Sequence, residues 1–216
     1  MLVVCCGMHR SGSTLQYQAA CALAKIAGGA IRLGFGLEKA EAHMTLPGKP
    51  FYLVKQHDFR SVCRRWHPDA ARFICSHRDP RDVLASMLQL GKERGAGWIA
   101  YIIRINNQWA SLPGTLMCRY EDLLLDLPGE IGKIASHMGI RASATDLLSV
   151  ASELSLEKQR EFTDSLPRKD EASQLKSGHV QGGDIGKWQH LLSPEQADMV
   201  VNMAGDWMKE NDYDFG

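Results

Sequence analysis

Hydrophobic positions gather in four short runs separated by longer amphipathic stretches. The runs are apolar or β-branched, are bounded by turn or charged residues, and cover Leu2–Cys6, Phe51–Lys55, Arg72–His77 and Thr115–Arg119. Such runs are typical of buried strands. Since strands that alternate with helices form parallel sheets covered on both faces, the pattern predicts an α/β fold, a parallel β-sheet flanked by helices on both faces.

Helical patterns fill the stretches between these runs. The clearest start is at Asp79-Pro80, where the aspartate can cap the helix and the proline suits its first position. Further helices are predicted over 13–27, 98–112, 128–138 and 194–209. The polar, weakly patterned residues 141–185 predict short helices and a long loop over the edge of the sheet that carries the site.

Length and composition narrow the classes of protein. The chain has 216 residues, of which 44% are hydrophobic and 23% charged, as in an ordinary globular protein. We expect one domain over residues 1–216. Because 25 Lys and Arg balance 25 Asp and Glu, the charge does not favour a nucleic-acid partner.

Cysteine usage and hydropathy suggest where the protein works. The six cysteines form no Cys-x-x-Cys pair, and most lie in the predicted strands, as free thiols in a reducing compartment do. No apolar stretch approaches the roughly 18 residues of a membrane helix. We therefore expect a cytoplasmic protein with no membrane association.

A glycine-containing turn joins the first predicted strand to the first predicted helix. Its sequence over residues 7–14 is Gly-Met-His-Arg-Ser-Gly-Ser-Thr. Backbone N–H groups of such a turn and the helix N-terminus bind anions, and the hydroxyl side chains add donors. The spacing is that of a nucleoside-triphosphate P-loop, but Ser13 replaces its lysine and the cation is Arg10, which argues against ordinary ATP chemistry. The candidate anion-binding residues are Arg10, Ser11, Gly12, Ser13 and Thr14.

A second candidate anion site follows the third predicted strand. Arg78 ends the strand, and Ser86 lies on the helix that follows, roughly 9 Å beyond its start at 1.5 Å per residue. The two side chains can grip one anion from two sides, and the arginine fork suits phosphate. A surface ion pair between Arg78 and Asp82 is the alternative explanation.

The second predicted strand ends in a cation and an imidazole. At the period of two residues in a strand, Lys55 and His57 point to the same face. A histidine can act as a general base because its pKa is near neutral. The alternative is an ordinary surface histidine after a strand.

Together these motifs resemble those of the sulfotransferases that use 3′-phosphoadenosine-5′-phosphosulfate (PAPS). Residues 10–14 resemble the 5′-phosphosulfate loop of that family, and the Arg-x-Pro-x-Asp-x-x-x-Ser pattern of residues 78–86 resembles its 3′-phosphate motif. Residues 119–123 resemble its Tyr-Glu-Asp-Leu segment, and residues 183–188 the loop that closes over the cofactor. The four segments stand in the family's order.

The resemblance implies a P-loop-kinase-like sulfotransferase fold, PAPS as the sulfuryl donor, 3′-phosphoadenosine-5′-phosphate (PAP) as the product, and no metal. It implies that His57 is the general base, that Lys55 lies by the transferring group, and that Arg10 stabilises charge on the sulfuryl oxygens. It places Tyr120 beside the adenine. The acceptor is expected to be a small molecule rather than a protein.

The chain departs from the family pattern in two places. Leu15 replaces an aromatic residue that often follows the loop threonine. The Arg-Lys-Gly that commonly precedes the last glycine-tryptophan pair is replaced by Gln181, Gly182 and Gly183, which leaves backbone groups, with Lys187 or His179, for the 3′-phosphate.

Two other functions are compatible with this sequence. A small P-loop kinase of a nucleotide or metabolite shares the strand–loop–helix start, although Ser13 argues against it. A catalytically inactive relative that only binds nucleotide is the other alternative, and the intact Lys55 and His57 argue against it.

Overall fold

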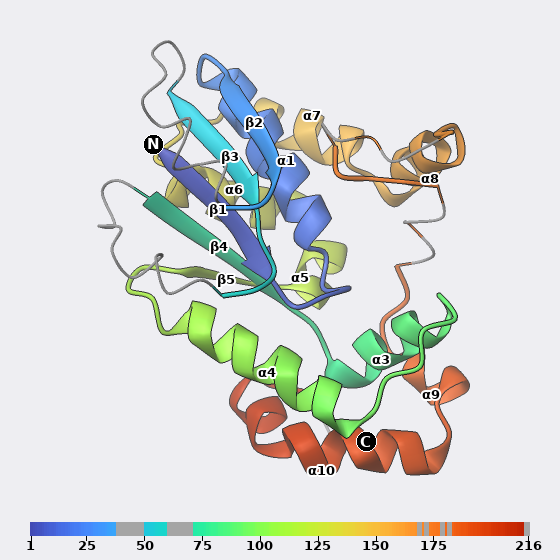
Figure 1. The fold of residues 1–216 in the computed structure, drawn as a ribbon. Helices are drawn as coiled ribbons and strands as arrows, with labels where there is room; N and C mark the ends of the chain where they lie inside the picture. The colour runs from blue at the N-terminus through green and yellow to red at the C-terminus, as the bar shows by residue number, and fades with distance from the viewer. Residues whose placement is uncertain are drawn as a thin grey trace.

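A parallel β-sheet forms the centre of the computed structural model, which describes residues 1–37, 50–59, 71–167, 170, 173–177, 180 and 183–213. Its strands are β1 (Leu2–Gly7), β2 (Ala30–Phe35), β3 (Phe51–Lys55), β4 (Ala71–His77) and β5 (Leu116–Arg119). They lie in the order β2-β3-β1-β4-β5, and every neighbouring pair is parallel (Figure 1). The four predicted strands and the parallel sheet are confirmed.

Helices connect and cover the strands. Their bounds are α1 (Ser13–Ile26), α3 (Pro80–Leu88), α4 (Ala96–Ala110), α5 (Tyr120–Leu125), α6 (Leu127–His137), α7 (Ala144–Glu153), α8 (Leu156–Asp164), α9 (Trp188–Leu191) and α10 (Pro194–Glu210). The predicted start at Asp79-Pro80 is confirmed, because the Asp79 side chain accepts from the backbone N–H of Arg81 and caps α3.

Side chains of alternate residues in β1 pack into the core on opposite faces of the sheet. Val3 and Cys5 pack with α1, α6 and α7 on one face of the sheet, whereas Leu2, Val4 and Cys6 pack with α4 on the other. All five side chains are fully buried. A strand buried on both faces needs a continuous apolar run, which is why this pattern was readable in the sequence.

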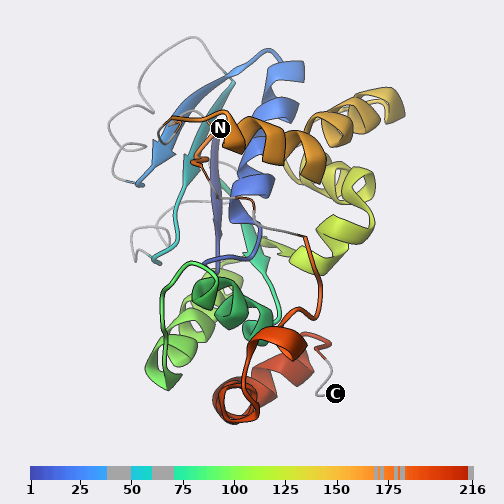
Figure 2. The same ribbon diagram turned by 90° about the vertical axis from the view of Figure 1, so that its right-hand side faces the viewer.

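A third cluster of buried side chains joins α3, α4 and α10 below the sheet. Val83, Ile99 and Ile102 pack there against Val200 and Trp207 of α10. Figure 2 shows α10 lying across this end of the molecule, beyond α3 and α4. The last helix therefore supports the helix start that carries the second anion motif.

Strand β2 was missed by the sequence analysis. It is the edge strand, it is only partly buried, and its register with β3 shifts between Arg32 and Gly34. An edge strand needs no continuous apolar run, so its pattern is weak.

Two serine-capped helices occupy the first part of the weakly patterned region. Ser143 and Asp146 form a capping box at the start of α7, and Ser155 accepts from the backbone N–H of Lys158 at the start of α8. The Ser-x-x-Asp spacing was the signal in the sequence that could have located α7.

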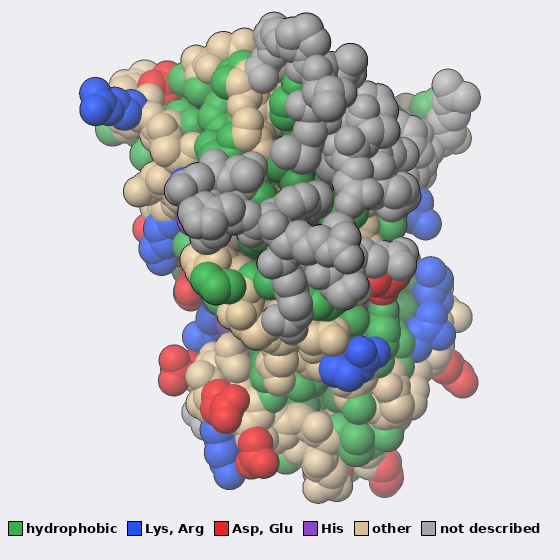
Figure 3. Space-filling view, turned by 60° about the vertical axis from the view of Figure 1, so that its left-hand side comes forward, with side chains coloured by type: hydrophobic (Ala, Val, Ile, Leu, Met, Phe, Trp, Pro, Cys, Tyr) green, Lys and Arg blue, Asp and Glu red, His purple; other side chains and the backbone are tan. Residues whose placement is uncertain are grey.

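The five cysteines within the described residues are buried and free. Within the same part of the chain, no helix is long and apolar enough to cross a membrane. Figure 3 shows one face of the molecule, where Lys and Arg side chains are interspersed with Asp and Glu side chains around the lower half.

Candidate functional site

The turn after β1 is shaped by two glycines with positive φ. Gly7 has φ 132°, and a Cβ there would lie 2.2 Å from the carbonyl oxygen of Ser76 on β4. Gly12, the residue before α1, has φ 80°, and its Cβ would lie 2.7 Å from Cδ2 of Tyr120. Neither position can carry a side chain without movement of its neighbours, so both glycines of the P-loop-like spacing are required by this packing.

The Ser11 side chain is engaged within the protein. Its hydroxyl lies 2.7 Å from the carbonyl oxygen of Met8 and 2.7 Å from Oγ of Ser76, and the residue is fully buried. Internal hydrogen bonds of the loop occupy this hydroxyl, and Ser11 does not line the cavity described below, so its hydroxyl as a ligand donor stays a prediction. Its backbone N–H remains a predicted anion donor.

A cavity of about 670 Å³ opens at the carboxyl ends of β1 and β3. The end of β1 is also the point where the chain order reverses, because β3 lies on one side of β1 and β4 on the other, and ligands of α/β sheets bind at such points. The predicted site residues that line the cavity are Arg10, Gly12, Ser13, Thr14, Lys55, His57, Arg78, Ser86, Tyr120 and Gly183. The predicted positions Gln181 and Gly182, and His179, lie outside the described residues.

Arg78 is buried beside the cavity and is held from three directions. It forms an ion pair with Asp82 (Nη2–Oδ2 3.2 Å), donates to the backbone oxygen of Asp184 (2.8 Å), and lies over the Tyr120 ring at 4.2 Å. The ion pair that was the alternative explanation exists, but it is buried rather than at the surface. The residue lines the cavity, and its Nε–H is buried without a hydrogen-bond partner.

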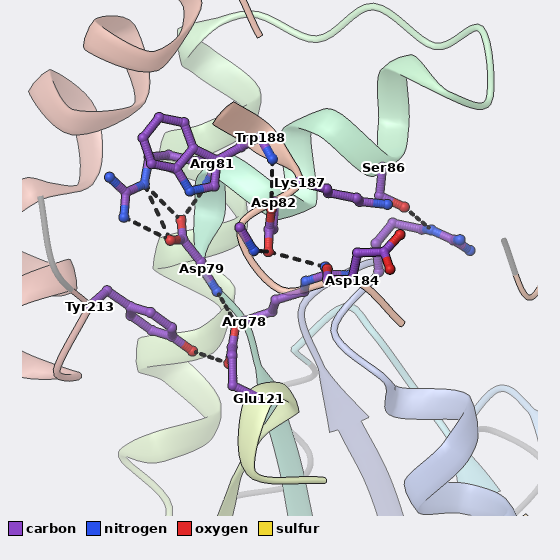
Figure 4. A network of polar contacts seen from close by, with 12 residues as sticks. Arg78, Asp79, Arg81, Asp82, Ser86, Glu121, Asp184, Lys187, Trp188 and Tyr213 are labelled. Carbon is purple, nitrogen blue, oxygen red and sulfur yellow. Dashed lines mark hydrogen bonds and ion pairs between the residues drawn. The ribbon is translucent and has the colours of Figure 1, made fainter. Parts of the chain in front are cut away.

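Asp82 connects the start of α3 to the segment 183–188. Its carboxylate is fully buried and accepts from the backbone N–H groups of Gly186 (2.9 Å) and Trp188 (3.0 Å) as well as from Arg78 (Figure 4). The Trp188 ring lies against Arg81, whose Cζ is 4.1 Å from the ring centroid. This aspartate therefore docks the predicted closing loop, a role that its position in the motif did not reveal.

A second network supports the same helix start from below. Glu121 accepts from the backbone N–H of Asp79 (3.2 Å) with one carboxylate oxygen and from the hydroxyl of Tyr213 (3.2 Å) with the other (Figure 4). The Tyr213 hydroxyl also lies 2.9 Å from Nδ1 of His77. Burial raises the pKa of Glu121 and lowers the pKa of His77 to about 4. The sequence analysis included Glu121 in the Tyr-Glu-Asp-Leu segment but did not find its contact with Tyr213, because 92 residues separate the two.

Three cations gather at one end of the cavity. Arg10, with a left-handed φ of 64°, donates from Nε to Oγ of Ser86 (2.9 Å) and so joins the two anion motifs. Burial lowers the pKa of Arg10, and the nearby Arg78 acts in the same direction. Burial, then Arg78, lowers the pKa of Lys187 to about 8. Cations that disfavour one another around a cavity mark a place for an anion.

Lys55 and His57 line the cavity together, as their spacing predicted. The Lys55 ammonium is buried and donates to Oγ1 of Thr14. Nδ1 of His57 lies 2.9 Å from the carbonyl oxygen of Gly7, and the backbone oxygen of His57 accepts from the Trp109 indole N–H (2.8 Å). Because a carbonyl oxygen only accepts, the neutral ring carries its proton on Nδ1 and its lone pair on Nε2.

One wall of the cavity is apolar. Leucines from α1, α5 and the α7–α8 region form this wall, namely Leu15, Leu123, Leu124, Leu154 and Leu156, with Leu175 and Val180. A site that combines a cluster of cations with an aliphatic wall suits an anionic ligand with a flat, apolar part, such as a phosphorylated nucleoside. Within the described residues, no group of three or more His, Cys, Asp or Glu side chains could hold a metal ion.

Comparisons with known proteins agree with this geometry. A family model described as the sulfotransferase domain matches residues 96–212, more than half of the chain. The fold is similar to that of mouse sulfotransferase SULT7A1 complexed with PAP, with a TM-score of 0.73, 15% identity, and coverage of 98% of this chain and 85% of that one. It is also similar to retinol dehydratase in complex with androsterone and PAP, with a TM-score of 0.69, 19% identity, and coverage of 97% and 81%. No curated protein matches the sequence.

Proposed function

Because this chain belongs to the sulfotransferase domain family, we propose that it transfers the sulfuryl group of PAPS to a hydroxyl or amine of a small-molecule acceptor. Similar folds occur in a complex of SULT7A1 with PAP and in complexes of retinol dehydratase with androsterone or retinol and PAP. These complexes support PAPS as the donor and a small molecule as the acceptor.

The observation that carries the proposal is the cluster of three cations, Arg10, Arg78 and Lys187, that lines the cavity next to the turn after β1. These cations disfavour one another, and a bound anion would relieve that repulsion. The Ser86 hydroxyl oxygen, which also lines the cavity, accepts from Arg10. We assign Arg78, Ser86 and Lys187 to the 3′-phosphate, and the backbone N–H groups at Gly12, Ser13 and Thr14 to the 5′-phosphosulfate.

Nε2 of His57 is the atom that accepts the proton of the acceptor. The hydrogen bond to Gly7 holds the ring in the tautomer that presents this lone pair, so no rotation or proton exchange precedes the reaction. The acceptor O–H or N–H bond breaks as its electron pair attacks sulfur, and the proton moves to Nε2. A general base of this kind contributes about 10²–10⁴-fold to a rate.

Lys55 and the backbone N–H groups of the loop stabilise negative charge on the sulfuryl oxygens and on the leaving oxygen. Bound at this site, PAPS supplies the sulfuryl group, and PAP leaves with the electron pair of the broken S–O bond. As in phosphoryl transfer, positioning and electrostatics provide most of the catalysis. The Lys55 ammonium donates to Thr14 in the first turn of α1, and this contact ties the end of β3 to the start of that helix.

Calorimetric titration with PAP tests the donor site directly. We expect PAP to bind without Mg²⁺, and ATP with Mg²⁺ to bind far more weakly. The reverse order of affinities would favour the P-loop kinase. Incubation with ³⁵S-labelled PAPS and a panel of phenols, alcohols and amines, in EDTA, then tests transfer. Tight PAP binding with no labelled product from any class would favour the inactive nucleotide-binding relative.

Two further properties remain proposals. We propose that residues 1–216 act as one sulfotransferase domain and that the protein works in the cytoplasm. The five buried, free cysteines within the described residues support the second proposal.

A further inference from the structure

A second imidazole lies against the predicted base. The rings of His9 and His57 are stacked, with centroids 4.2 Å apart and planes 27° apart. Both side chains line the cavity. The loop holds His9 in place from one side, because the backbone N–H of the preceding Met8 donates to the Ser76 carbonyl of β4 (3.0 Å). The stack therefore joins the anion-binding loop to the end of β3.

The surroundings of the pair keep both rings fixed. Trp98 of α4 lies on the His9 side, with ring centroids 6.4 Å apart, and Phe35 of β2 lies on the His57 side at 5.8 Å. His57 is held through Nδ1 by Gly7. The His9 ring therefore packs on the face of the His57 ring, with Trp98 also near it, while Nδ1 of His57 is directed to Gly7.

We propose that His9 is a positioning residue for the base: its ring, stacked on that of His57, stabilises the imidazolium that forms when His57 accepts the proton. This inference rests on the proposed function of His57. An aromatic face attracts a cation, and a ring that stays neutral does not repel one. The proton balance is simple, since the proton that leaves the acceptor resides on Nε2 of His57 and His9 gains none.

The charges around His9 favour its neutral form. Burial lowers its pKa, and three cations act in the same direction: Lys55 from β3, and Lys92 and Arg94 from the segment before α4. Asp58, directly after His57, acts in the opposite direction, but its carboxylate accepts from the hydroxyl of Tyr101. His9 therefore remains uncharged near pH 7, when a proton arrives at its neighbour.

The test is a titration of His57 by ¹H–¹³C NMR of the histidine ring, with and without PAP, in wild type, His9→Leu and His9→Phe. The His57 signal is assigned by its loss in His57→Gln. Leucine fills the space without a π face, whereas phenylalanine keeps the face and removes the nitrogens. We expect His9→Leu to lower the pKa of His57 by roughly half a unit. His9→Phe should leave it no lower than in wild type.

Two results would overturn the inference: an unchanged His57 pKa in His9→Leu, or an equal fall in His9→Phe and His9→Leu. Calorimetry on the same samples reports PAP affinity and shows that each variant is folded. If wild type fails to bind PAP, the proposed function fails. If wild type binds PAP and the His57 pKa does not depend on the ring at position 9, only the inference about His9 fails.

Discussion

The proposed 3′-phosphate site and the proposed base are held in place in different ways. At the phosphate site, Arg78 and Asp82 form an ion pair with one another and hydrogen bonds with the backbone of 184–188, more than 100 residues away in the chain. The base, His57, is held by the main-chain oxygen of Gly7 and by the packing of aromatic rings. Charged side chains therefore form the first site, whereas a backbone group and ring faces hold the base.

Because of this difference, we expect substitutions at the phosphate site to change nucleotide affinity and substitutions at the base to change the rate of turnover. Cations that are held in place around a cavity are preorganised for an anion, so the loss of one of them should reduce binding of the nucleotide. A base oriented by the backbone contributes only when the acceptor loses its proton, so its loss should reduce turnover.

The largest effect is expected for His57→Ala. Turnover of ³⁵S-labelled PAPS with the best acceptor of the panel should fall by about 10²–10⁴-fold, because the variant lacks a group that accepts the proton. PAP affinity measured by calorimetry should stay nearly unchanged, since the cation cluster is intact. The matched control is His137→Ala, which removes a histidine hydrogen-bonded to the Phe73 carbonyl outside the cavity and should keep the rate. A large loss of PAP affinity in His57→Ala would make His57 a positioning residue.

Arg78→Ala should produce the next largest effect. The loss of a charge-assisted hydrogen bond of about 1.5–3 kcal/mol should weaken PAP binding by about 10- to 150-fold. Binding of AMP, which lacks the 3′-phosphate, should change far less. The control is Arg81→Ala, because Arg81 lies at the same helix start but pairs with Asp79 and Trp188 and does not line the cavity. Equal losses for PAP and AMP would remove the 3′-phosphate assignment.

The smallest effect concerns Lys187 and pH. Its pKa lies at about 8, so its ammonium is charged below that pH and neutral above it. A bound phosphate dianion favours the charged form, so PAP affinity should be highest below about pH 8 and fall as the pH rises through that value. The phosphate groups are already doubly charged at these pH values, because the second pKa of a phosphate monoester is about 6. Because Lys187 is only partly buried, the fall should be no more than about fivefold.

Calorimetry of PAP binding across this pH range checks the assignment. Lys187→Met should flatten the profile and reduce affinity only on the acidic side. The exposed Lys133, which pairs with Glu130 on α6, supplies the control Lys133→Met. A profile in Lys187→Met that still falls through pH 8 would mean that another group senses the phosphate.

Local patterns in the sequence were sufficient for the scaffold and for much of the site. Continuous apolar runs predicted four of the strands, and Asp79-Pro80 predicted the start of α3, because strand burial and helix capping depend on residues close together in the chain. The strand period placed Lys55 and His57 on one face, and both line the cavity. The spacing of the glycines predicted the tight turn after β1. In the structure, this turn packs so closely against Ser76 and Tyr120 that Gly7 and Gly12 have no room for a side chain.

The tertiary structure alone decided which of these groups meet. The Ser11 hydroxyl turns to the backbone of β4, Arg10 reaches Ser86 across 76 residues, and Asp82 docks the backbone of 186–188. The stack of His9 on His57 belongs to the same class, since it brings together residues from two different strand ends. Hydrogen bonds and ring contacts act only over a few ångströms. Local sequence patterns do not predict which side chains from distant parts of the chain will lie that close together.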